Sequence, residues 1–122
     1  MKYTTYASGL IDISDLPMIN KIQIKSYLEE FYGKQEASNF YDESNVIIYD
    51  EWESFEEGQE FLFMIYKISK QIRKDVKSLI ICNGERDGDI WGVIIKDNRM
   101  FTQRFELKPD GNMEEYDKVG KK

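Results

Sequence analysis

Apolar and polar residues follow two different periods along the chain, and each period predicts one kind of element. Five segments show the alternation of a half-buried strand or the short apolar run of a buried one. These are residues 4–13, 46–52, 79–82, 90–95 and 100–107. In the first of them both faces carry some apolar groups. Two other segments repeat their apolar residues every three or four positions, which is typical of amphipathic helices.

The first predicted helix begins between Asp15 and Asn20 and ends at Gly33. Pro17 is tolerated in a first turn, where its missing N–H would be unpaired, and glycine suits the conformation that ends a helix. The apolar stripe has the spacing i, i+3, i+4, i+7 and consists of Ile24, Tyr27, Leu28 and Phe31. We expect the polar segment 34–44 that follows to be a loop of moderate length, partly ordered by the rings of Phe40 and Tyr41.

The second predicted helix begins at a capping box. Ser54 can accept a hydrogen bond from the backbone of Glu57, and the Glu57 side chain can reach back to the backbone of Ser54. The buried stripe consists of Phe61, Leu62, Ile65, Ile68 and Ile72. Phe63, Met64 and Tyr66 add more apolar surface than one face needs, which indicates burial on two sides or an exposed patch. A homo-oligomer would be one use of such a patch.

Turn residues connect the last three strands as hairpins. Asp87-Gly88 and Asp97-Asn98 suit tight turns with positive φ. The predicted order is β-α-β-α-β-β-β, an α+β fold with a C-terminal three-strand antiparallel meander and two helices packed on the sheet. We expect one domain over 1–111 and a polar, flexible tail over 112–122. The pattern leaves open whether the first two strands are neighbours.

Charge is unevenly distributed in this 122-residue chain of net charge −6. Residues 35–66 contain nine acids and no base, so the rest of the chain is net positive. The acids are Glu36, Asp42, Glu43, Asp50, Glu51, Glu53, Glu56, Glu57 and Glu60. Such a segment repels phosphates, so direct nucleic-acid binding is not expected, and it favours basic partners.

Two interpretations of the acidic segment compete. In one, its charges are a solvated surface, and Glu56, Glu57 and Glu60 complement the positive end of the second helix. In the other, acids and aromatics form a face that binds the basic surface of a protein partner. The candidate partner-binding residues are Tyr41, Asp42, Glu43, Asp50, Glu51, Trp52, Glu53, Phe55, Glu56, Glu57 and Glu60.

Enzyme chemistry finds little support in the composition. The chain has no histidine and one cysteine, which removes the commonest general base and any Cys/His zinc site. Glu85, Asp87 and Asp89 fit a turn better than a metal or catalytic site. Cys82 is expected to be a core residue. We therefore expect a protein that is not an enzyme, with no catalytic residue, no metal and no cofactor.

No apolar stretch is long enough to span a membrane, and the first residues do not resemble a signal peptide. The expected location is the cytoplasm, which would be the host cytoplasm for a phage-encoded protein.

Residues 84–91, Gly-Glu-Arg-Asp-Gly-Asp-Ile-Trp, are followed by a strand and a tight turn over 93–98. This arrangement resembles a recurring pattern in small phage and mobile-element proteins, and the glycine-containing strand at 5–13 is similar to how such proteins begin. The resemblance implies an α+β protein of the kind that inhibits host defence machinery by stoichiometric binding. It implies no catalytic residue, and the acidic segment lies outside it.

The sequence thus supports a small acidic binding protein as the first hypothesis: a phage-type inhibitor that occludes a basic surface of a host nucleic-acid-handling or defence enzyme. One alternative is a nucleotide-like ligand binder in which Arg99 or Arg104 holds an anion. Another is a toxin-neutralising immunity protein, which would share the acidic face.

Overall fold

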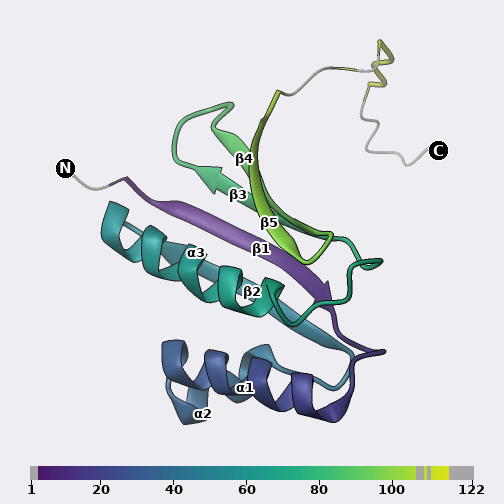
Figure 1. The fold of residues 1–122 in the computed structure, drawn as a ribbon. Coiled ribbons are helices and arrows are strands. Elements are labelled where there is room, and N and C mark those ends of the chain that lie inside the picture. The colour runs from purple at the N-terminus through teal and green to yellow at the C-terminus, as the bar shows by residue number, and fades with distance from the viewer. Residues whose placement is uncertain (1–2, 107–108, 110, 116–122) are drawn as a thin grey trace.

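The computed structural model describes residues 3–106, 109 and 111–115, and Figure 1 shows the arrangement of its elements. The strands are β1 (Thr5–Asp12), β2 (Asn45–Trp52), β3 (Ser78–Gly84), β4 (Ile90–Lys96) and β5 (Arg99–Phe105). The helices are α1 (Met18–Tyr32), α2 (Lys34–Ala37) and α3 (Phe55–Ser69), with a 3₁₀ turn at Ser38–Phe40. The α+β fold with a C-terminal meander is confirmed.

The five strands form one antiparallel sheet in the order β2-β1-β3-β4-β5. The first two strands are therefore neighbours, and β1 also pairs with β3. This arrangement makes β1 the strand that joins the β2 edge to the meander. Two connections between strands contain helices. α1 lies between the neighbouring strands β1 and β2, and α3 lies in the connection from β2 over β1 to β3.

The segment 34–44 is more regular than the partly ordered loop that its sequence predicts. It forms α2 and the 3₁₀ turn, because two of its residues find apolar partners. Ala37 is fully buried, and the Phe40 ring stacks on Tyr32 with ring centroids 4.1 Å apart. Packing against the end of α1 thus overrides the local signal.

The core lies on one face of the sheet, between the strands and the helices. Alternate residues of the four strands β1 to β4 point into it, as do the apolar stripes of α1 and α3. The strand residues are Ala7, Ile11, Val46, Ile48, Ile80, Cys82, Val93 and Ile95. Figure 1 shows α3 running along the sheet, with α1 and α2 beyond it. The opposite face, called here the open face, is covered by no described helix.

Both helices begin close to the predicted residues, and α1 also ends as predicted, whereas α3 ends at Ser69 and leaves Ile72 of the predicted stripe buried beyond the helix. α1 starts at Met18 after Pro17, and Gly33 ends it at φ +91° with its N–H donating to the Glu29 carbonyl at 2.8 Å. α3 has the predicted capping box, in which Glu57 N–H donates to Ser54 Oγ at 3.1 Å. These caps satisfy backbone groups that a helix end leaves unpaired.

The C-terminal prediction is only partly covered by the described residues. Residues 111–115 are exposed, as expected of a polar tail. Leu107, which was assigned to the last strand, and residues 116–122 lie outside the described residues.

One side chain fastens the meander to the end of α3. Asp97 and Asn98 have φ of 55° and 63° in the β4–β5 turn, as Asp-Asn predicts. The Asn98 amide donates to the carbonyls of Ser69 at 3.0 Å and Ile72 at 2.7 Å. A single residue thus supplies both the turn conformation and the contact with the helix.

We expect Asn98→Ala to lower the free energy of unfolding by about 2–4 kcal/mol, because it removes two hydrogen bonds and because alanine tolerates positive φ less well than asparagine does. Asn98→Gly is the matched control, since glycine keeps the turn conformation and loses only the hydrogen bonds. It should recover about 1 kcal/mol of that loss. Urea unfolding measures both variants, and an Asn98→Ala protein as stable as the wild type would refute the contact.

Candidate functional site

The predicted acidic face separates into two groups at opposite ends of β2. Tyr41, Asp42 and Glu43 precede the strand, whereas residues 50–60 lie at its far end and in the start of α3. An extended strand of eight residues places the two ends about 23 Å apart. A sequence-continuous block of acids is therefore not one continuous surface.

The first group is largely neutralised by α1. Lys21, a buried residue, donates from Nζ to the Glu43 carbonyl at 2.7 Å and lies 3.6 Å from its carboxylate. The Lys25 ammonium lies 5.5 Å from the Tyr41 ring centre. Asp42 accepts a hydrogen bond from the Ser44 backbone at 2.7 Å. These contacts favour a role for the first group in holding α1 against the start of β2.

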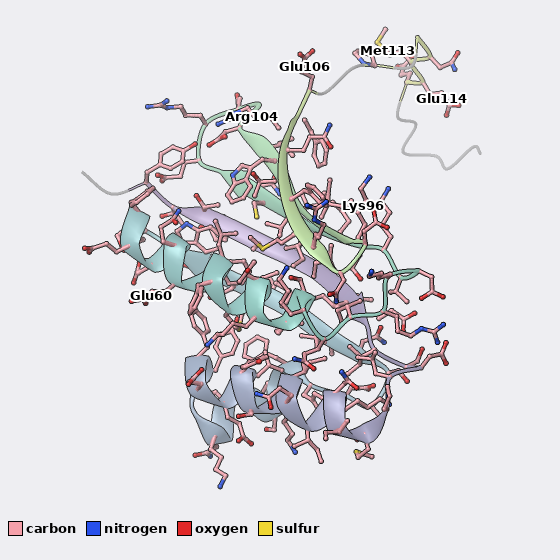
Figure 2. All side chains as sticks on the ribbon, in the orientation of Figure 1. Glu60, Lys96, Arg104, Glu106, Met113 and Glu114 are labelled. Atoms are coloured by element: carbon pink, nitrogen blue, oxygen red, sulfur yellow. The ribbon has the colours of Figure 1, made fainter. Side chains whose placement is uncertain are left out.

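Part of the second group lines a pocket of about 520 Å³ between the last turn of α1, the end of β2 and α3. We call it the acidic pocket. Its charged lining is Glu30, Asp50, Glu51, Glu57, Glu60 and Lys67. Its apolar lining is Phe31, Tyr32, Trp52, Phe61, Phe63 and Met64. Five carboxylates against one ammonium give it a strongly negative character, and Figure 2 shows Glu60 projecting from α3.

The floor of the acidic pocket is built from packed aromatic rings. Trp52 lies 4.9 Å from Phe61, centre to centre, and Phe31 meets Phe61 edge-on at 6.4 Å. Gly58 allows this packing, because a β-carbon there would lie 2.6 Å from Trp52 Nε1. The rings therefore form a rigid apolar surface beneath the carboxylates.

Asp50 is the carboxylate that lies deepest in this arrangement. It points to the helix-covered face of β2, and its side chain accepts hydrogen bonds from the Tyr32 hydroxyl at 3.0 Å and the Glu51 backbone at 2.8 Å. Burial raises the pKa of Asp50 above its ordinary value, and the charge of Glu57 adds to the rise, although the two hydrogen bonds oppose it. Burial and the Asp50 charge also raise the pKa of Tyr32, which keeps this phenol a donor.

Lys67 shows what chemistry the acidic pocket accommodates. Its ammonium lies 2.7 Å from Glu30 Oε1, 5.0 Å from the Phe63 ring centre and 5.1 Å from the Tyr27 ring centre. A cation held by a carboxylate and by the faces of aromatic rings is a favourable arrangement. The chain itself therefore supplies one example of a cationic side chain bound at the rim of this pocket.

The remaining predicted residues surround the start of α3. Glu57 closes the capping box, with Oε1 accepting from the backbone N–H groups of Glu53 and Ser54 at 2.9 and 3.2 Å. Glu56 lies in the first turn and is exposed, where its charge complements the helix N-terminus. Phe55 is 79% exposed and does not line the pocket.

Residues of α1 and the middle of α3 complete the acidic pocket and were not predicted. Glu30 and Tyr32 belong to the last turn of α1, and Tyr32 is 18 residues from its partner Asp50. No spacing of residues along the chain predicts a contact between residues so far apart in the sequence. The excess of apolar residues on the second helix was the one available signal, and Phe63 is among them.

Other candidate groups have structural roles. Asp89 accepts hydrogen bonds from the Tyr3 hydroxyl and from Arg104, the latter at 2.9 Å, and both contacts lower its pKa. Cys82 is buried as predicted, and burial raises the pKa of its thiol to about 12. Within the described part of the chain, no cluster of three or more acidic, Cys or His side chains is placed to hold a metal. None of the described helices has both the length and the apolar character to span a bilayer.

Comparison of the chain with protein-family models, with curated proteins and with solved structures found no match.

We expect Asp50→Asn to stabilise the fold at neutral pH. Because the folded-state pKa of Asp50 is raised, its ionisation is easier in the unfolded chain, so the charge lowers stability at pH values above the unfolded pKa. Asparagine removes this cost, accepts from the Glu51 backbone and donates to the Tyr32 oxygen. The difference in free energy of unfolding between the variant and the wild type should shrink as pH falls towards about 4. A difference that is independent of pH, measured by urea unfolding, would contradict this account.

Proposed function

We propose that the protein binds a basic surface of a partner protein and that the acidic pocket accepts a lysine or arginine side chain of that partner. The observation that carries the proposal is the combination of five carboxylates with an aromatic floor in one pocket. A guanidinium or ammonium can pair with the carboxylates while its plane or methylene groups lie on the rings.

The carboxylate of Asp50 supports a binding role over plain solvation. A solvated surface acid keeps its ordinary pKa, whereas Asp50 is half-buried and costs stability when ionised. An incoming cation would offset that cost, because it would favour the ionised form. The half-buried position of Asp50 thus explains both its raised pKa and its capacity to bind a cation.

A narrower form of the proposal concerns the biological role. The resemblance of residues 84–98 to small phage proteins supports an inhibitor that occludes a basic surface of a host nucleic-acid-handling or defence enzyme. A toxin-neutralising immunity protein would use the same acidic pocket and differ only in its partner.

Binding of a nucleotide-like anion has less support. Arg104 is paired with Asp89, which already offsets its charge, and Arg99 is exposed at the start of β5. Neither arginine lines the acidic pocket.

We expect the double variant Glu30→Lys/Glu60→Lys to weaken partner binding by more than about tenfold, because it reverses two charges that the helices contribute to the acidic pocket. The matched control is Glu36→Lys/Glu106→Lys, which changes two exposed acids outside the pocket and has the same net charge. The measurement is affinity capture from bacterial lysate on the immobilised proteins, with the retained protein identified and its dissociation constant then determined.

The wild type and the control should retain the same basic protein, and high salt should release it. Equal loss of binding in both double variants would show that the net charge of the protein, and not the acidic pocket, determines binding. Equal retention by both would exclude the acidic pocket as the binding site.

A further inference from the structure

The open face of the sheet is unusually apolar for a surface that no described element covers. It consists of the strand residues that point away from the helices, and their register is fixed by the strand pairing. The large apolar members are Tyr6, Leu10, Ile47, Tyr49, Leu79, Ile81, Ile90, Ile94, Phe101 and Phe105. Antiparallel sheets with one solvated face normally carry polar residues there. An apolar surface of this extent is typical of an interface.

One row of apolar side chains crosses all five strands of the open face. Leu10 pairs with Ile47 on one side and Leu79 on the other, Leu79 with Ile94, and Ile94 with Phe101. Four of the five are substantially exposed: Leu10 by 55%, Leu79 by 43%, Ile47 by 40% and Phe101 by 38%. The row is centred on Leu79 of the middle strand.

Charges beside this row differ in sign between the two halves of the sheet. Asp12 lies two residues beyond Leu10 on β1, and Lys96 lies two residues beyond Ile94 on β4. The two strands run in the same direction, so both charges flank the row on the same side. Arg99 lies opposite Lys96 in the register of β4 and β5 and extends the positive half of the face.

We propose that the open face is the interface of a symmetric dimer, in which a second copy of the chain packs face to face about a two-fold axis parallel to β3. This axis places β3 on its own copy, β1 on β4 and β2 on β5. The apolar row then meets itself: Leu79 meets Leu79, Leu10 meets Ile94, and Ile47 meets Phe101. Asp12 meets Lys96 of the second copy twice, once on each side of the axis.

The charge pattern selects this axis over the alternative. An in-plane axis perpendicular to the strands would place each strand on its own copy. If the apolar row then meets itself, Asp12 faces Ser8 and Lys96 faces Gly92, so neither charge meets an opposite charge. The axis along β3 has one like-charge contact, between the two copies of Lys77 at the rim. Two Asp12–Lys96 pairs oppose that single contact.

The size of the open face suits a dimer. Five strands about 4.8 Å apart and seven residues long at about 3.3 Å give a flat area of about 550 Å² per copy. Specific interfaces bury about 800 Å² per partner, counted over corrugated accessible surface. Two sheets packed face to face lie about 10 Å apart. The dimer does not depend on the acidic pocket, which lies on the helix side and stays exposed.

The first test is the oligomeric state of the full chain by sedimentation velocity from low micromolar to near-millimolar concentration. We expect a wild-type dimer, a monomeric Leu79→Asp variant and a dimeric Ile19→Asp control. Ile19 is 77% exposed on α1, so the control adds the same charge to an exposed apolar position away from the open face. Melting curves of all three establish that the variants fold. A Leu79→Asp variant that remains dimeric would overturn the proposal.

The second test locates the axis by cross-linking with a bismaleimide whose spacer is about 10 Å, the distance between packed sheets. Leu79→Cys should cross-link to its own copy, because it lies on the axis. Phe101→Cys should not, because the two copies of β5 lie on opposite edges of the dimer. The wild type is the blank, since Cys82 is buried. Cross-linking through Phe101→Cys but not through Leu79→Cys would overturn the proposed axis.

A third test addresses the charge pairs. Lys96→Glu should weaken the dimer several-fold, whereas Lys74→Glu, an equal charge change in the loop after α3, should leave it unchanged. Figure 2 shows Lys96 near the β4–β5 turn, far from Glu60 in the acidic pocket. Equal effects of the two substitutions would exclude Asp12–Lys96 pairing.

A wild-type monomer at all concentrations would overturn the dimer, and two further measurements then identify what covers the face. If Leu79→Cys reacts with a small maleimide much more slowly in the folded protein than in the unfolded chain, a segment of the same chain packs there. If the wild type binds neutral lipid vesicles and Leu79→Asp does not, the occupant is a bilayer.

Discussion

Burial of one sheet face against α3 is the constraint on which the other features depend. A side-chain period of two sends alternate residues of every strand to opposite faces, so a helix that covers one face leaves the other uncovered. Ile48, Ile65, Ile80 and Val93 are all at or near zero exposure on the covered side. The same pairing that aligns these residues also aligns Leu10, Leu79 and Phe101 on the open side. The core and the open face are therefore two results of one register.

The position of the acidic pocket follows from where that covered face ends. β2 is an edge strand, and the last turn of α1 and the first turns of α3 meet beyond its C-terminal end. Each brings a polar group that the fold must satisfy: the Tyr32 hydroxyl bonds Asp50, and Glu57 bonds the backbone at the start of α3. Carboxylates near a helix N-terminus are favoured by its dipole. The fold therefore gathers these acids at moderate cost, and only Asp50 is placed where its charge is unfavourable.

The sequence was sufficient for elements whose signal is local. Strand alternation, the Ser54–Glu57 capping box and the Asp97-Asn98 turn each act over a few residues, and each is found as predicted. In the segment 34–44 the ordering by Phe40 was expected, but the short helix α2 was not, because its order depends on tertiary contacts such as the stacking of Phe40 on Tyr32. The acidic segment was read as one surface because charge was counted along the chain. An extended strand separates Glu43 from Asp50, and tertiary packing brings Glu30 to the pocket instead.

The two surfaces lie on opposite sides of the sheet, and this separation has a geometric consequence. A dimer through the open face directs the helix layers, and with them both acidic pockets, away from the interface. Each pocket then faces a different direction, so two pockets cannot contact one small basic patch together. Two copies of a partner, or two distant sites on a symmetric partner, would fit this arrangement. Avidity would arise only where the spacing of basic sites matches that of the pockets.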